Sequence, residues 1–367
     1  MYSSDILYLV ALSKVNWIGP VLARKLLAHF GTAEAIFSAT KRDLMQMHGI
    51  SKALVQNLDF SSCVESAQVE LRMSEELDYR IIVYTDKDYP YRLKQRKDSP
   101  IVLYYTGNGD MDHHRILAIV GTRTPTSQGI SLCNQILESL QSCNIHVVSG
   151  LALGVDIAAH RKCLELDIPT YGVMGTGMDQ IYPYENRESA NKMRKLGGIL
   201  TEFGIGTQAE KVNFPMRNRI IAGMCDGLLV VESKVKGGSM ITAELANGYD
   251  RDVFALPGRP GDIFAQGCLH LIKHNKASLV ENGTDIAHAM NWNEEQIKRG
   301  AQTSLFVELN ASEQQLANLC KKPLPVSVDL FYQNWAGTPS ELAATILGME
   351  LKGLLRQLPG KQYIWNG

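Results

Sequence analysis

Several features that define common protein classes are missing from this sequence of 367 residues. It contains seven cysteines, an odd number, and no two of them stand in a C-x-x-C spacing. This pattern argues against a disulfide framework and against a thiolate zinc site. No group of histidines and cysteines has the spacing of metal ligands either, so the sequence predicts no metal site and suits a reducing compartment.

Long uncharged apolar runs are also absent, and the sequence therefore predicts no membrane-spanning segment. The first residues, Met1 to Asp5, lack the basic and apolar regions of a secretory signal peptide. The formal net charge is only -1, which excludes a uniformly basic coat for nucleic acid but not a local basic site. We expect a cytoplasmic protein that is not associated with a membrane.

The two common nucleotide-binding fingerprints are missing as well. The segment Gly121–Gly129 has the sequence GTRTPTSQG, which matches neither G-x-G-x-x-G nor G-x-x-x-x-G-K-[ST]. The absence of both fingerprints argues against hydride transfer and against ATP-driven chemistry. The sequence predicts no cofactor.

What the sequence does contain is a series of short apolar runs that alternate with helical patterns. The first run, Ile116–Val120, is followed by Gly121 and by apolar positions at helical spacing between Ile130 and Leu140. Apolar runs of this kind predict buried parallel strands, and their alternation with helices predicts a Rossmann-like, doubly wound, mostly parallel sheet of the α/β class. Five further strands are predicted at 145–150, 170–175, 198–202, 227–232 and 252–257.

Cations and small residues follow several of these strands. Ligands bind to doubly wound sheets at the carboxyl ends of the strands, where this sequence has Arg123, Arg217 and Lys234. Guanidinium groups clamp phosphate oxygens, and a helix that begins near Gly238 offers backbone N–H groups to an anion. The pattern predicts a phosphorylated ligand, although any single arginine is more often part of a structural ion pair.

Residues 1–74 are predicted to form a helical domain. Two turns that contain a hydrophobic residue and a glycine, Ile18-Gly19 and His48-Gly49-Ile50-Ser51, each precede a helical pattern. This arrangement is typical of helix-hairpin-helix (SAM-like) units, in which backbone N–H groups at a helix start approach a phosphate. Both glycines suit tight turns in a helical bundle equally well, so DNA contact and a structural role both stay open.

Residues 305–367 are predicted to form a winged-helix-like domain, which a polar linker at 291–304 separates from the core at 75–290. Three helices are expected, followed by a strand-turn-strand that ends at Trp365. The third helix, Thr338–Glu350, is the expected recognition helix and has almost no positive charge. The pattern favours partner binding or an auxiliary role over recognition of a DNA duplex.

Seven motifs, in order along the core, together resemble the DNA-processing protein A (DprA, also called Smf) family. They are Val120–Arg123, Ser149–Asp156, Met174–Asp179, Glu202–Gly204, Phe214–Gly223, Gly237–Ala243 and Phe254–Gly258. The resemblance implies a protein without enzymatic activity that binds single-stranded DNA, forms a homodimer through the Rossmann-like core and loads the recombinase RecA during natural transformation. Apolar residues at Tyr249–Ala255 and Gly267–Ile272 suit either such a dimer surface or the protein core.

The resemblance also implies which residues form the DNA site. The cations of the site are Arg123, Arg217, Arg219, Lys234 and Lys236, and the small residues that shape its floor are Gly150, Gly175, Gly177, Gly238 and Ser239. Cations neutralise phosphates and glycines permit a close backbone approach. Few aromatic residues are available for base stacking, namely Tyr182, Tyr184 and Phe214.

An enzyme is the main alternative. Arg217 and the segment Gly237–Glu244 resemble, more loosely, phosphoribohydrolases that cleave nucleoside monophosphates with an arginine clamp and a glutamate. Here Ser239 and the two residues after it replace a further glycine of that family, which weakens the catalytic interpretation. A structural hub with a vestigial crevice is the third class that the near-neutral charge leaves open.

Overall fold

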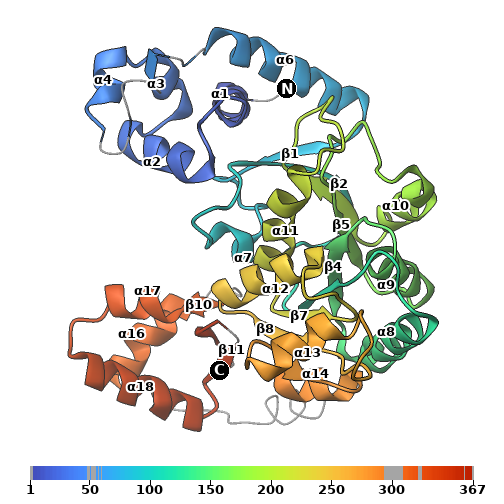
Figure 1. The fold of residues 1–367 in the computed structure, drawn as a ribbon. Coiled ribbons are helices and arrows are strands. Elements are labelled where there is room, and N and C mark those ends of the chain that lie inside the picture. Colours follow the sequence, from blue (N-terminus) through green and yellow to red (C-terminus); the bar gives the residue numbers. More distant parts are fainter. Residues whose placement is uncertain are drawn as a thin grey trace.

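The structure is a computed structural model that describes residues 3–47, 50, 55–56, 58, 60–292, 309–320, 325–358 and 360–365. N-terminal helices, a large sheet covered by helices and a small C-terminal unit follow one another along the chain (Figure 1). In the described part of the chain, no helix is both long and apolar enough to span a membrane.

The central sheet has nine strands in the order β1-β2-β6-β5-β4-β3-β7-β8-β9. Its strands are β1 (Arg80–Val83), β2 (Val102–Gly107), β3 (Ile116–Val120), β4 (His146–Gly150), β5 (Thr170–Val173), β6 (Gly198–Thr201), β7 (Gly227–Val230), β8 (Asp252–Ala255) and β9 (Ser278–Leu279). All neighbours from β6 to β9 pair in parallel, whereas β1 and β2 form an antiparallel extension at one edge. The chain moves outward from β3 to β6 and returns beside β3 at β7, which confirms the predicted doubly wound topology.

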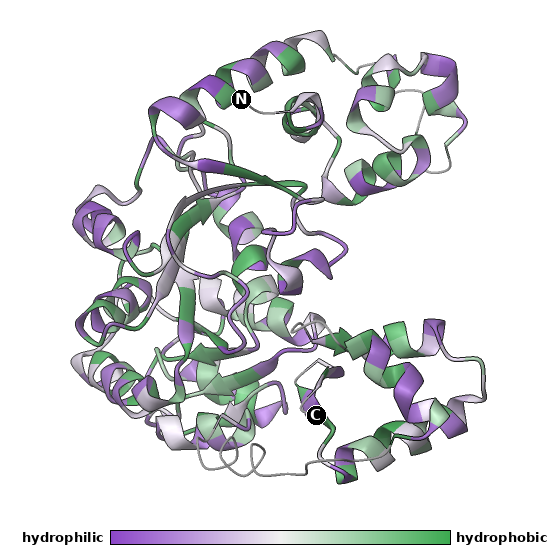
Figure 2. Ribbon diagram, turned by 180° about the vertical axis from the view of Figure 1, so that it is seen from behind, coloured by the Kyte–Doolittle hydropathy of each residue, from purple (hydrophilic) through white to green (hydrophobic). Residues whose placement is uncertain are grey.

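Helices cover both faces of this sheet. One face packs against α8 (Ser127–Leu140), α9 (Val155–Glu165) and α14 (Gly283–Ala289), and the other against α11 (Asn213–Met224), α12 (Gly238–Gly248) and α13 (Gln266–Lys273). Successive residues of β3 alternate between the two cores, with Ala118 in one and Leu117 and Ile119 in the other. Both faces are therefore dry, and hydrophobic strands lie between helices with hydrophilic outer surfaces (Figure 2).

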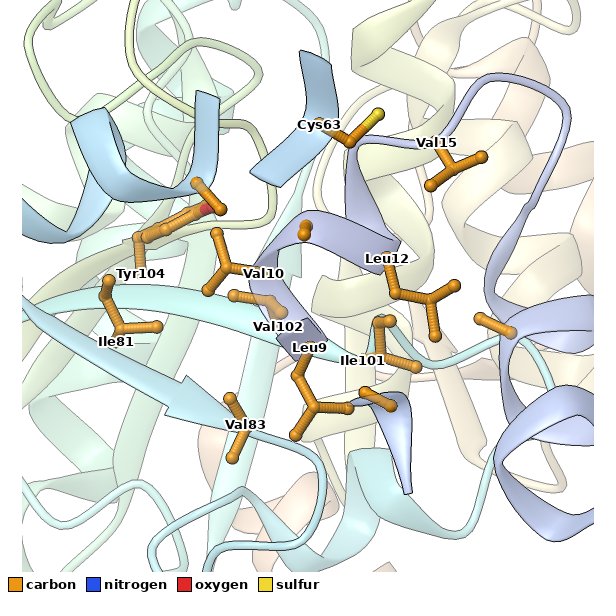
Figure 3. Packing of buried hydrophobic residues seen from close by; sticks show 14 of the residues in the cluster. Leu9, Val10, Leu12, Val15, Cys63, Ile81, Val83, Ile101, Val102 and Tyr104 are labelled. Atoms are coloured by element: carbon orange, nitrogen blue, oxygen red, sulfur yellow. The ribbon is translucent and has the colours of Figure 1, made fainter. Parts of the chain in front are cut away.

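The N-terminal helices are α1 (Ser4–Ser13), α2 (Pro20–Phe30), α3 (Ala33–Ser38), α4 (Lys41–Met45) and α6 (Ser61–Glu76). Gly19 precedes α2 as its N-cap, at the first predicted hairpin, and Ile50 is the one described residue of the second. Figure 3 shows Leu9 and Val10 of α1 beside Ile81 and Val83 of the antiparallel extension, within one shared hydrophobic cluster. The helical domain is thus fused to the edge of the sheet by apolar contact.

One side chain of α2 adds a polar connection between these parts. The guanidinium of Arg24 donates to the Tyr84 hydroxyl at 2.7 Å and to the Ser99 hydroxyl at 3.1 Å, and it lies 4.4 Å from the centre of the Tyr84 ring. It also donates to the carbonyl oxygen of Arg96. All of these partners belong to the segment around β1 and β2, so α2 is held firmly against the core.

The C-terminal unit contains α16 (Ala311–Cys320), α17 (Val328–Gln333) and α18 (Pro339–Leu351), with a small sheet of β10 (Val326–Ser327), β12 (Gln362–Trp365) and β11 (Leu355–Leu358). A capping box between Thr338 and Glu341 begins α18, the predicted recognition helix. The second predicted helix starts two residues late, because Val326 and Ser327 pair with the terminal strand. Of the predicted linker only residues 291 and 292 are described, and Trp292 is buried in the core of the sheet.

Candidate nucleic-acid interface

A small cavity of about 40 Å³ lies where the carboxyl ends of β3, β4 and β5 meet α11. It is lined by Arg123, Leu151, Ala152, Leu153, Val173, Met174, Gly175, Tyr182, Pro183, Phe214 and Arg217. We call this site the strand-end cleft. Its place next to the point where the strand order reverses is where ligands bind in doubly wound sheets.

Arg217 of α11 forms the floor of the strand-end cleft. Its side chain is only 6% exposed, and its nearest carboxylate oxygen, Oδ2 of Asp156, lies 3.9 Å from Nη1. Within the described residues, neither Nε nor Nη1 has a hydrogen-bond partner. Burial lowers the pKa of this guanidinium. A buried cation with unused donors is strongly destabilising unless an acceptor reaches it, and a phosphate oxygen in the cleft would be such an acceptor.

Asp156, at the first turn of α9, does not fully compensate this charge. Burial raises the pKa of its carboxyl to about 6, against the opposing effect of Arg217. The group therefore loses its charge near neutral pH more easily than an ordinary aspartate. The balance of the floor is cationic, and it becomes more so as the pH falls.

Arg123 and Phe214 form the wall of the cleft. Arg123 is exposed on the loop after β3, and its guanidinium lies 5.3 Å from the centre of the Phe214 ring. The Tyr182 ring is 5.9 Å from that of Phe214, and Tyr182 is itself 44% exposed. A cation held on an aromatic face beside a second ring suits both a phosphate and a nucleobase.

Two of the predicted glycines are required by this packing. A Cβ atom on Gly150, the last residue of β4, would lie 1.5 Å from Nη1 of Arg217. A Cβ atom on Gly175 would lie 3.2 Å from the Phe214 ring. Because Gly150 and Gly175 have no side chains, there is room for Arg217 and Phe214 of α11. Gly177 is buried nearby, against the carbonyl oxygen of Gly204.

His160 supports the end of β4 from behind. Its Nε2 lies 2.9 Å from the carbonyl oxygen of Gly150 and its Nδ1 lies 2.7 Å from the Thr170 hydroxyl. Burial lowers the pKa of this histidine to about 4, so the ring is neutral and holds the strand end in place. The pairing with Asp156 one helical turn away, which its spacing predicts, is replaced by these two contacts.

The structure does not bring the remaining predicted cations into the strand-end cleft. Arg219 is buried and forms an ion pair with Glu202. Lys234 and Lys236 are exposed on the loop between β7 and α12, and Nζ of Lys234 lies 5.2 Å from the centre of the Phe264 ring. Both lysines are free to meet a long ligand outside the cleft, whereas Arg219 is not.

At the start of α12, the predicted ligand-binding residue Ser239 has a structural role instead. The hydroxyl of Ser239 donates to that of Ser233 at 2.7 Å and is buried. Gly238 is exposed, and a Cβ atom there would meet nothing within 4 Å. The Ser239 hydroxyl thus fixes the turn, while the backbone at Gly238 is open to an anion.

The carboxylate that the enzyme alternative requires lies elsewhere. Glu244 forms an exposed ion pair with Lys276, 2.6 Å apart, and does not line the strand-end cleft. Glu232, at the end of β7, accepts hydrogen bonds from the backbone and hydroxyl of Thr126 at the start of α8. Neither glutamate faces Arg217, so the geometry offers no support for glycosidic-bond cleavage. Among the residues described, no group of histidine, cysteine, aspartate or glutamate could hold a metal ion.

Sequence reasoning underestimated the aromatic part of the site. Phe214 stands three residues before Arg217 on α11 and therefore shares its face. Two other residues that line the cleft, Leu153 and Tyr182, are exposed apolar side chains. The helical spacing of Phe214 and Arg217 was the signal that could have identified this pair.

These features define a Rossmann-like α/β protein whose strand ends present cations and aromatic rings. The family model described as DNA recombination-mediator protein A matches residues 80–291, and a model described as SAM-like helix-hairpin-helix tandem matches residues 9–58. Protein Smf of Synechocystis sp. is 31% identical over 99% of both chains, and Protein Smf of Escherichia coli is 30% identical over 81% of this chain and 80% of its own.

Two solved structures are also similar to this chain. DNA processing protein A of Streptococcus pneumoniae superposes with a TM-score of 0.65 at 32% identity, over 78% of this chain and 98% of its own. The homologue from Helicobacter pylori, whose structure was described for its single-stranded DNA binding mode, has a TM-score of 0.53 at 28% identity, over 58% and 95% of the two chains. The chain therefore belongs to the DNA-processing protein A (DprA/Smf) family, which confirms the resemblance seen in the sequence motifs.

Proposed function

We propose that the protein binds single-stranded DNA in the strand-end cleft. The observation that supports this most directly is Arg217, a buried guanidinium with unused donors at the floor of the cleft. A phosphodiester oxygen would satisfy these donors, while Arg123 contacts the same or the next phosphate. The single-stranded DNA binding described for the Helicobacter pylori homologue supports the same assignment.

The aromatic wall favours a single strand over a duplex. Phe214 and Tyr182 line a cavity of about 40 Å³, and Tyr182 is 44% exposed. A base must leave its stack to lie against either ring, and this is much easier in a single strand. Duplex DNA would reach only the exposed cations outside the cleft, such as Lys234 and Lys236.

Further steps follow from membership in the family and belong to the same proposal. The protein protects incoming strands and loads the recombinase RecA onto them during natural transformation in the cytoplasm, without catalysing a reaction.

A homodimer forms through the core, where Ile263 is 58% exposed and Leu269 and Ile272 are half-buried. The chain divides into a helical domain at 1–74, a core at 75–290, a linker at 291–304 and a winged-helix-like domain at 305–367.

A double variant tests the DNA site. Arg123→Ala combined with Arg217→Ala removes both cations of the cleft, and we expect weaker binding of a single strand with a log–log salt slope shallower by about 1.4. The control is Lys276→Ala, which removes an exposed charge paired with Glu244. Unchanged affinity and slope in the double variant would exclude the strand-end cleft as the DNA site.

A further inference from the structure

A second basic cleft lies at the antiparallel edge of the sheet. Its volume is about 660 Å³, and its lining includes three cations but only one carboxylate: Arg80, Arg194, Lys195 and Asp78. The cleft is located at the amino end of β6, where Gly107 of β2 pairs with Gly198. The strand-end cleft lies at the carboxyl ends of the parallel strands, so the two sites lie at opposite ends of the strands.

The cations of this second cleft are available for a ligand. Arg194 and Lys195 form no ion pair with any described residue, and Nε of Arg194 is buried without a hydrogen-bond partner. Arg80 lies 5.1 Å from the centre of the Tyr105 ring and 3.6 Å from Asp88, where both members of the ion pair are more than half exposed. Exposed pairs of this kind contribute little stability, so a phosphate competes with Asp88 readily.

One short helix lies between the residues of the two clefts along the chain. Tyr182 and Pro183 line the strand-end cleft and lead directly into a short 3-10 turn at Tyr184–Asn186 and then into α10 (Arg187–Met193), whose C-cap is Arg194. The charges of this connecting segment balance, since Glu185 and Glu188 accompany Arg187 and Lys192. The guanidinium of Arg187 lies 5.8 Å from the centre of the 71% exposed Tyr184 ring. α10 rises only about 10 Å along its axis, and it lies on the outside of the molecule (Figure 1).

We propose that Arg80, Arg194 and Lys195 bind the phosphodiester backbone of the DNA strand after it leaves the strand-end cleft along α10. Tyr184 offers a stacking surface on the way, and the second cleft offers cations without an exposed aromatic ring, which suits phosphates rather than bases. This inference rests on the proposed function. It assigns the protein a binding site longer than the strand-end cleft.

The test compares strands of two lengths, about 4 and about 16 nucleotides, with the full chain. In the triple variant Arg80→Gln, Arg194→Gln, Lys195→Gln, we expect affinity for the long strand to fall on the order of tenfold and its salt slope to become shallower by about 2. Affinity for the short strand stays unchanged. The matched control is Lys276→Gln, a lysine that pairs with Glu244 at 2.6 Å and lines neither cleft.

Each outcome decides a different point. An unchanged affinity of the triple variant for the long strand overturns the second site and leaves the strand-end cleft intact. If wild-type protein binds neither strand, the proposed function fails and this inference fails with it.

Should the triple variant not fold, wild-type protein is compared on the short and the long strand. A salt slope that is the same for both strands overturns the inference, and a steeper slope for the long strand supports it. Inorganic phosphate as competitor shows whether a free anion occupies the second cleft instead, which would also overturn it.

Discussion

Arg217 is the residue on which the strand-end cleft depends. Its guanidinium is buried beside the end of β4, and the space for it exists because the last residue of β4, Gly150, has no side chain. Asp156 balances its charge only in part. The side chain is therefore held in place without being satisfied, which is the condition in which a buried cation binds an anionic ligand most strongly.

Gly150→Ala tests the space beside Arg217. The added methyl group would lie 1.5 Å from Nη1 of Arg217 and 2.5 Å from Oδ2 of Asp156, so both buried side chains must shift. We expect affinity for single-stranded DNA to fall on the order of tenfold, and overpacking of this buried site to cost about 1–3 kcal/mol in the free energy of unfolding. Binding and denaturant titrations measure the two effects. Gly248→Ala, where a Cβ meets nothing within 4 Å, is the control, and equal losses of affinity in both variants would contradict the role of Gly150.

Asp156 makes DNA binding dependent on pH. Its pKa of about 6 is raised further when a phosphate binds beside Arg217, because a second negative charge disfavours the carboxylate. Protons and DNA therefore bind cooperatively, and a shift of about one further unit gives about a tenfold gain in affinity as the pH falls from about 7.5 to about 5. Affinity measured across this range at constant salt should be nearly constant in Asp156→Asn. The same pH response in the variant would show that another group is responsible.

Two arginines show what the sequence could and could not predict at this scale. Arg217 and Arg219 stand two residues apart on α11 and are identical in chemistry. Residues at this separation face nearly opposite sides of a helix, so only one of them reaches the cleft while the other pairs with Glu202. The sequence analysis placed both arginines in the DNA site, but which of them faces the strand-end cleft depends on how α11 packs on the sheet.

At the level of elements, the six parallel strands at the centre of the sheet were predictable because each is an apolar run buried on both faces. The antiparallel extension could not be predicted in the same way. β1 pairs with β2, and β2 pairs with β6, a contact between distant parts of the chain that no local pattern encodes. This extension also builds the wall of the second cleft, which therefore escaped the sequence analysis.

Glu70 of α6 connects the helical domain to the loop that leads into α11. Its carboxylate is 1% exposed and accepts hydrogen bonds from Lys14 at 2.7 Å, from the Tyr79 hydroxyl at 2.9 Å and from the backbone N–H of Ile205. Glu70→Ala leaves these donors without their acceptor, and we expect a loss of about 3 kcal/mol in the free energy of unfolding.

Denaturant unfolding measures this loss, and hydrogen exchange should show faster opening of α1 and α6. Arg72→Ala, an exposed position on the same helix, should remain within about 0.5 kcal/mol of the wild type. Similar values for the two variants would show that Glu70 contributes little to holding the helical domain on the core.

At the scale of the whole molecule, the two basic clefts lie at opposite ends of the strands, and α10 lies between their residues along the chain. The helical domain packs on the antiparallel edge of the sheet. In the C-terminal unit, the side-chain amide of Gln362 donates to Gln95 of the core at 2.7 Å. The near-neutral total charge thus conceals two local groups of cations, one in each cleft.

The most direct test of this account is a salt titration of the full-length protein by fluorescence anisotropy, with a single strand and a duplex of matched sequence and a nucleoside monophosphate as competitor. The account predicts a salt-dependent preference for the single strand, with a log–log slope of about -0.7 for each phosphate contact and little displacement by the monophosphate. Equal affinity for the duplex, or ready displacement by the monophosphate, would contradict it and identify the strand-end cleft as a site for a small nucleotide.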